Sequence, residues 1–141
     1  MSILRGRDAL EKNRPSGEYF YIEDISVKQT TWEDKYEDWA RWKIGNCFKT
    51  KEKAYEHIEF LIMSARLQKF ADANNSEIVW NGKNPNYVLS YKHNLAVIEV
   101  VPCLYQNYGT IIFSSEEIAT AAIKEFGEKE IIKYYFRVKG D

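Results

Sequence analysis

The segment "EFLIMSARLQKF" (residues 59–70) lies inside the longest helix that the sequence predicts, and it is apolar on two sides. Helical periodicity defines this helix over residues 51–73, with Thr50 as N-cap and the polar residues "NNS" as the stop. At about 100° per residue, one apolar stripe forms the ordinary core face and a second lies close to the opposite side. The first stripe consists of Ala54, Ile58, Leu61, Ile62 and Ala65, and the second of Phe60, Met63, Leu67 and Phe70.

The second stripe needs a cover, because a helix that packs on a sheet requires only one apolar face. Fully burying a Phe, Met or Leu side chain contributes roughly 1.5–3 kcal/mol, so an exposed stripe of four would forgo roughly 6–12 kcal/mol. The cover is either intramolecular, from the C-terminal helix or the N-terminal hairpin, or intermolecular. In the intermolecular case the stripe is a self-association surface of a homodimer or a docking site for a partner.

Patterns on both sides of this helix predict an α+β fold with an antiparallel sheet and C-terminal helices packed on it. Before the helix, "EYFYIEDISVKQTTWE" (residues 18–33) predicts a β-hairpin with a turn at Glu23 and Asp24, and residues 34–46 are expected to be irregular. After it, strands are expected at residues 77–81, 87–94, 95–106 and 108–114. Ser114 and Glu117 fit a capping box for a helix over residues 116–126, with Gly127 at its end and a closing helix over residues 128–136.

Length and composition set the broad class. The 141 residues fit one domain, expected over residues 18–141, after an N-terminal arm (residues 1–17) that is flexible or forms a short helix. With 20 basic and 21 acidic residues the net charge is −1, which argues against a strongly basic nucleic-acid binder and an extreme acidic mimic. No apolar run of about 18 residues occurs, so we expect a soluble, cytoplasmic protein that does not engage a membrane.

Motifs for catalysis or metal binding are missing from the sequence. It contains no Gly-rich phosphate loop, His-Glu-x-x-His pair or nucleophile elbow, so we expect a protein that is not an enzyme and has no cofactor. Cys47, His57, His93 and Cys103 have zinc-binding side chains, but no two lie close enough in sequence to form a chelating pair. Use of Cys47 as a nucleophile with His57 as its base would require the two side chains to be adjacent, which their spacing in the sequence does not ensure either. Both cysteines are expected to be reduced.

The acidic run "EDKYED" (residues 33–38) offers a candidate interaction surface. A charge run is usually a solvated face, and a domain of this size tends to bury its tryptophans. The functional alternative is a partner-binding patch for a basic protein surface, in which tryptophans act as anchors. The residues of this patch are Trp39, Trp42, Glu37 and Asp38.

Two further binding functions remain open. Basic residues next to aromatic ones can hold phosphates while bases stack, which makes nucleic-acid binding an alternative. Its candidate residues are Arg41, Lys43, Lys49 and Lys51. The ten tyrosines also permit capture of a nucleotide signal in an aromatic-lined pocket between subunits.

Two segments, "GNCFKTKEKA" (residues 45–54) and "GTIIFSSEEIATAAIKEFGEKEIIKYYF" (residues 109–136), carry a family resemblance. They resemble the signature segments of small accessory proteins of phages and prophages of low-GC Gram-positive bacteria, and the likeness runs over residues 18–136. It implies an accessory protein that binds and disables host machinery in the cytoplasm of an infected bacterium. Host targets of such proteins include RNA-guided nucleases, so an anti-CRISPR-like inhibitor is expected, and no catalytic residue is carried over.

Overall fold

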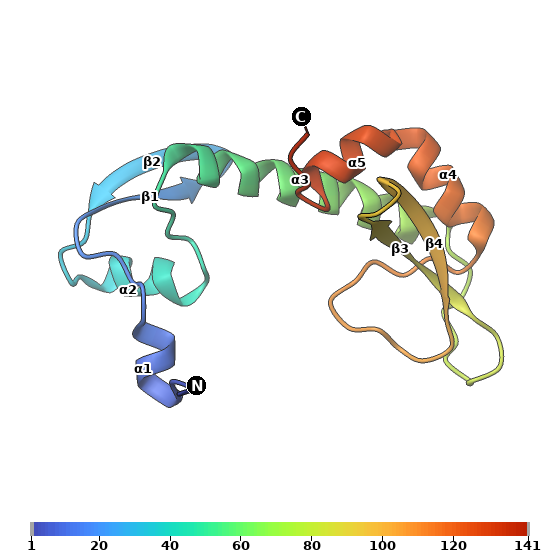
Figure 1. Ribbon diagram of the computed structural model, residues 1–141, viewed down its shortest axis with the longest axis horizontal. Helices are drawn as coiled ribbons and strands as arrows, with labels where there is room; N and C mark the ends of the chain where they lie inside the picture. Colours follow the sequence, from blue (N-terminus) through green and yellow to red (C-terminus); the bar gives the residue numbers. More distant parts are fainter. Residues whose placement is uncertain (1, 141) are drawn as a thin grey trace. The chain divides into compact units, whose positions relative to one another are not determined.

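The structure, a computed structural model, describes residues 2–140 and has the α+β arrangement that the sequence predicts (Figure 1). Its contacts group into two compact units, of which the first ends at Ile58 and the second begins at Glu59. This boundary falls inside the long helix, and the single domain predicted over residues 18–141 stays a prediction. The elements are α1 (Gly6–Glu11), β1 (Glu18–Glu23), β2 (Ser26–Thr31), α2 (Tyr36–Lys43), α3 (Lys51–Asn74), β3 (Asn86–Lys92), β4 (Val97–Cys103), α4 (Glu116–Phe126) and α5 (Glu128–Tyr134).

The first unit is built on the predicted hairpin. Strands β1 and β2 pair antiparallel from Glu18 opposite Thr31 to Glu23 opposite Ser26. Asp24 in the connecting turn adopts a left-handed backbone with φ of 57°, which a short polar side chain tolerates. The arm before the hairpin contains the short helix α1.

Helix α2 replaces the irregular segment that the sequence predicted for residues 34–46. The Asp38 carboxylate accepts the backbone N–H groups of Glu33 and Lys35 at 2.9 and 3.1 Å, which satisfies donors at the start of the helix. The prediction was wrong because this short helix is stabilised by a buried side chain rather than by an apolar stripe.

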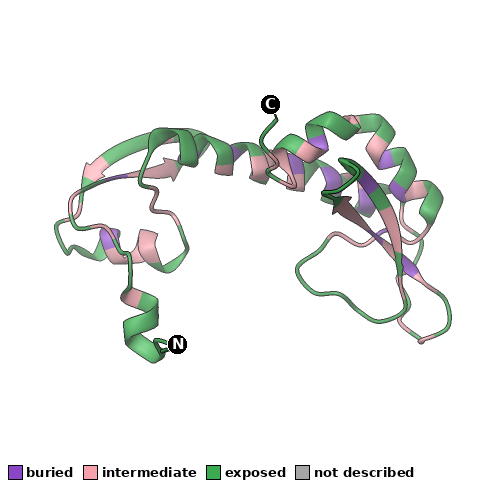
Figure 2. Cartoon of the chain, in the orientation of Figure 1, coloured by how far each residue is buried: buried purple, intermediate pink, exposed green. Residues whose placement is uncertain are grey.

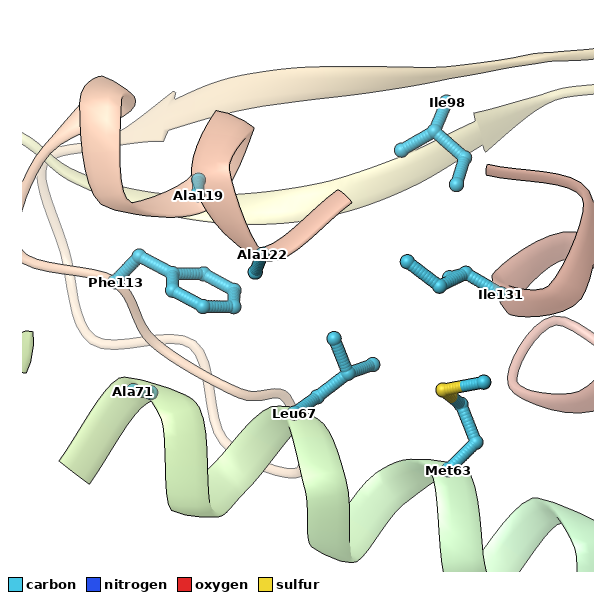
Figure 3. Packing of buried hydrophobic residues seen from close by; sticks show 8 residues of the cluster. All are labelled: Met63, Leu67, Ala71, Ile98, Phe113, Ala119, Ala122 and Ile131. Carbon is cyan, nitrogen blue, oxygen red and sulfur yellow. The ribbon is translucent and has the colours of Figure 1, made fainter. Parts of the chain in front are cut away.

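The second unit packs the C-terminal part of α3 with α4, α5 and the antiparallel pair β3–β4. Figure 3 shows Met63, Leu67 and Ala71 of α3 pointing toward Phe113, Ala119, Ala122 and Ile131. Ile98 of β4 completes the buried cluster.

The second apolar stripe of α3 is therefore covered by the chain itself. Met63 and Leu67 are 2% and 0% exposed, the Phe60 ring stacks on Tyr135, and Phe70 meets the ring edge of Phe126. The hypothesis of a self-association surface formed by Phe60, Met63, Leu67 and Phe70 is wrong, because these side chains already pack inside the second unit.

The first stripe, expected to form one core face, divides between burial and solvent. Ala54 and Ile58 are buried, whereas Leu61 is 48% exposed and Ala65 is also exposed. Helix α3 thus contributes Ala54 and Ile58 to the buried residues of the first unit and Met63 and Leu67 to those of the second.

Two expected strands of the second unit are absent from the described residues. Residues 77–81 have no regular structure, and residues 108–114 contribute only a bridge between Phe113 and Tyr87. The polar residues around them are used for cross-links: the Asn75 amide donates to Ile112 O, and Asn75 Oδ1 accepts from Ser114 N, at 2.8 and 2.9 Å. These side-chain bonds replace a sheet ladder.

The C-terminal helices form where the sequence predicts them, except that the N-cap of α4 lies one residue later. The N-cap of α4 is Ser115, whose Oγ accepts the Ile118 N–H at 3.2 Å, and not Ser114. Ser114 Oγ instead accepts the backbone N–H of Ser76. Gly127 ends α4 with φ of 88°, a conformation that favours glycine, as predicted. Within residues 2–140, no helix combines the length and apolar character needed to cross a membrane.

Candidate functional site

A buried polar cluster holds α2 against the hairpin in the first unit. The Tyr19 hydroxyl of β1 donates to Asp38 Oδ1 at 2.5 Å, and Arg41 Nη1 donates to the same Tyr19 oxygen at 3.0 Å. Tyr19 and Asp38 are 1% and 3% exposed, and Asp38 is the buried residue of α2. Figure 2 shows a buried stretch within this helix. The carboxylate accepts three hydrogen bonds and has Arg41 at 3.8 Å, so its charge is compensated.

This environment shifts two pKa values in opposite directions. Burial acts to raise the pKa of Asp38, but the hydrogen bonds from Tyr19, Glu33 and Lys35 together outweigh burial and lower it below its usual value. Burial, and then the hydrogen bond to Asp38, raises the pKa of Tyr19 to about 12. At neutral pH the pair is a carboxylate and a neutral phenol, which is the state that the hydrogen bond requires.

Aromatic rings organise the basic residues of the same unit. The Arg14 guanidinium lies 5.3 and 5.2 Å from the ring centroids of Trp32 and Trp39. The Arg41 guanidinium lies 3.7 Å from the ring centroid of Tyr21. Cation–π contacts of this kind restrict long side chains that would otherwise be mobile.

The predicted partner patch of Trp39, Trp42, Glu37 and Asp38 is not a continuous outer surface. Asp38 is buried, so its assignment to a partner contact is wrong. The indoles are half-buried and use their N–H groups within the chain: Trp39 donates to Asp34 Oδ1 at 2.6 Å and Trp42 to Leu10 O at 2.7 Å. Glu37 alone of the four is exposed.

The predicted nucleic-acid residues divide in a similar way. Lys43, Lys49 and Lys51 are exposed. Arg41 points inward to Tyr19, and its side chain is 24% exposed. Arg41 therefore compensates the negative charge of the buried Asp38 and is not presented as a phosphate ligand.

The sequence patterns did not predict two exposed apolar residues, of which one lies in α2 and the other directly after it. Tyr36 is 83% exposed and Ile44, directly after the helix, is 78% exposed. They share a side with Ala40, because these three residues follow one another at intervals of four. We call Tyr36, Glu37, Ala40 and Ile44 the outer face of α2. Helical spacing would have revealed this face if the segment had been interpreted as a helix.

A cleft of about 460 Å³ lies between the end of the arm and the segment that leads into α3. It is lined by residues 13–19, Trp42 and residues 47–49. Burial raises the pKa of the Cys47 thiol in this cleft to about 11, so the thiol is protonated at neutral pH and is a poor nucleophile.

The four candidate zinc ligands have other surroundings. His57 packs on Phe48 and His93 on Tyr91, with ring centroids 5.4 and 4.7 Å apart, and both cysteines are free thiols. Within residues 2–140, no group of three or more His, Cys, Asp or Glu side chains is arranged to hold a metal ion.

Comparison of the chain with protein-family models, with curated proteins and with solved structures finds no match.

Proposed function

We propose that this chain is a phage accessory protein of the anti-CRISPR type, a binding protein that is not an enzyme and that inhibits a host antiviral component in the cytoplasm of the infected bacterium. The resemblance over residues 18–136 supports the phage origin. The observation that supports direct contact as the mechanism is the outer face of α2. Tyr36 on the helix and Ile44 directly after it are 83% and 78% exposed, and the inner side of the helix is fixed.

The outer face of α2 has the properties of a binding anchor. Exposed aromatic and aliphatic side chains on one side of a rigid element are typical of contact residues, and aromatic residues dominate binding energies. The buried Asp38 and Arg41 hold the helix, so Tyr36 loses little freedom on binding. Anchors presented in this way favour a protein partner.

Charge favours a basic partner. Three acidic side chains are exposed at or just before the start of α2: Glu33, Asp34 and Glu37. One basic side chain, Lys35, lies among them, with its Nζ 3.3 Å from the Glu33 carboxylate. RNA-guided nucleases hold their nucleic acids in positively charged channels, which an acidic rim around an apolar anchor complements. Such a channel is the partner surface that we propose.

A plaquing assay tests this function. Cells that each carry one antiviral system express the wild type, a Tyr36→Ala variant or a Tyr108→Ala variant, and a phage that the system blocks is plated. Tyr108 is the matched control, because it is 81% exposed and lies in the second unit. We expect the wild type and the control to restore plaques in one strain, and loss of Tyr36 to weaken target binding by at least about 30-fold.

Two outcomes contradict the proposal. One is failure to restore plaques in every strain although the protein is expressed and folded. The other is that the Tyr36→Ala variant restores plaques as fully as the wild type. If the protein instead shifts nucleic acid in a gel, and substituting Lys43, Lys49 and Lys51 removes the shift, the nucleic-acid alternative replaces it. That binding would weaken steeply with added salt.

A further inference from the structure

The cleft of the first unit has a size and lining that the proposed protein contact does not use. Its volume of about 460 Å³ lies within the range of roughly 300–1,000 Å³ that is typical of small-molecule sites. Its walls come from residues 13–19, Trp42 and residues 47–49. The site is therefore formed within one chain and needs no second subunit.

Two cations of the cleft have no anionic partner in the described chain. The Arg14 guanidinium is exposed and rests on the Trp32 and Trp39 rings, and over residues 2–140 its side chain forms no hydrogen bond or ion pair. Lys49 is exposed and forms no ion pair in the same range. Arginine presents several donors in one plane that match phosphate oxygens, and two indole rings lie beside the Arg14 guanidinium.

Two aromatic side chains line the same cleft and are held in place. The Trp42 indole is fixed by its hydrogen bond to Leu10 O at 2.7 Å. Phe48 is fixed by two backbone hydrogen bonds to Phe20, at 2.8 and 2.9 Å, and by the contact of its ring with His57. Aromatic faces next to cations provide stacking for a base and charge for its phosphate.

The remaining polar groups of the cleft are compatible with such a ligand. Cys47 is a neutral thiol at neutral pH, so it does not repel a phosphate as a thiolate would. Glu18 is the acidic residue of the lining and can accept hydrogen bonds from an amino or hydroxyl group. Together, Arg14, Lys49 and Glu18 give the lining one net positive charge.

We propose that this cleft binds a nucleoside monophosphate group, with the base against Trp42 and Phe48 and the phosphate on Arg14 and Lys49. The same chemistry occurs in a free nucleotide and at the end of a single-stranded nucleic acid. Binding requires neither the outer face of α2 nor a target protein, so this proposal stands or fails independently of the inhibitor function.

The experiment follows indole N–H signals by NMR while 5′-AMP, adenosine, inorganic phosphate or a single-stranded hexanucleotide is added. We expect 5′-AMP to shift the Trp42 signal and to leave that of Trp80, in the second unit, in place. Adenosine and phosphate alone are each expected to bind at least about 10-fold more weakly, because each makes half of the contacts. A hexanucleotide that binds more tightly than 5′-AMP identifies a strand end as the source, and the reverse order identifies a free nucleotide.

Charge-neutral variants locate the phosphate. Arg14→Gln is expected to weaken 5′-AMP binding by about 10-fold or more. Lys49→Gln, which leaves the Arg14 stack intact, is expected to weaken it by about threefold to fivefold. Lys28→Gln is the matched control on the exposed side of β2 and leaves the affinity unchanged. The proposal is overturned if millimolar 5′-AMP leaves the Trp42 signal unmoved, or if adenosine binds as tightly as 5′-AMP. It is equally overturned if Lys49→Gln and a folded Arg14→Gln variant both bind like the wild type.

Discussion

Replacing Leu67 with Ala tests which side of α3 is the core of the second unit. Leu67 is 0% exposed and packs in the buried cluster with Phe113 and Ile131 (Figure 3). Truncating a leucine in such a position removes buried apolar surface and leaves a cavity, so we expect the free energy of unfolding to fall by about 2–5 kcal/mol. The matched control is Leu61→Ala on the same helix.

The control variant distinguishes the face of α3 that the structure buries from the face that periodicity assigns to the core. Leu61 belongs to the stripe that periodicity assigns to the core, but it is 48% exposed. Because half of its side chain is already in water and no closed cavity forms, we expect Leu61→Ala to cost less than about 1 kcal/mol. Urea unfolding followed by circular dichroism measures both variants, with the slope against urea unchanged. A loss for Leu61→Ala equal to or larger than that for Leu67→Ala would refute the assignment of the buried face.

Three further predictions concern titrating groups of the first unit. Asp38→Asn is expected to lower the free energy of unfolding by about 1–3 kcal/mol at neutral pH. Because the folded pKa of Asp38 is depressed, the stability that its carboxylate contributes is present above about pH 4 and is lost as the pH falls further. Thermal melts below that pH should therefore show a smaller loss of stability for the variant than for the wild type. Tyr19 has a folded pKa of about 12, so its contribution is complete below about pH 10 and is lost as the pH rises through the folded pKa; Tyr19→Phe removes the last tyrosinate step from an ultraviolet titration. Cys47, studied in a Cys103→Ser background, has a pKa of about 11, so iodoacetamide at pH 8 is expected to alkylate it at least about 10-fold more slowly in the folded protein than in urea.

The long helix shows what hydrophobic periodicity can and cannot establish. It located the helix to within a residue at each end and revealed both apolar stripes, because each is a local property of residues 51–74. It could not show which residues of each stripe are buried, since that depends on which residues distant in sequence pack against them. Ala54 and Ile58 are buried in the first unit, and Met63 and Leu67 in the second.

The acidic run shows a different limit. A carboxylate in a charged segment is usually solvated, and nothing local distinguishes Asp38 from Glu37. The difference arises from Tyr19, 19 residues away, whose hydroxyl meets Asp38. Once Asp38 is placed inside, helical spacing assigns Arg41 to the same side and Tyr36 to the opposite one. A partner patch predicted from the acidic run and its neighbouring tryptophans therefore combined residues of both sides.

The strands were predicted best where ladder pairing satisfies the backbone. Both hairpin strands and β3–β4 agree with their alternating patterns. Residues 108–114 have a similar apolar pattern, but only Phe113 joins a strand, and the Asn75 side chain satisfies the Ile112 carbonyl and the Ser114 N–H on either side of it. Side-chain to backbone bonds across about 38 residues are invisible to a periodicity argument.

Helix α2 connects the two proposals made for the first unit. Its inner side carries Asp38 and Arg41, which fix the helix on β1, and its end carries Trp42, which lines the cleft. Its outer face presents Tyr36 to solvent. Because Asp38 and Arg41 already hold the helix, a ligand that stacks on Trp42 has little left to order, and we expect the cleft and the outer face to bind their ligands independently. Linkage then requires that a target protein bound to the outer face leaves the affinity of the cleft for 5′-AMP unchanged.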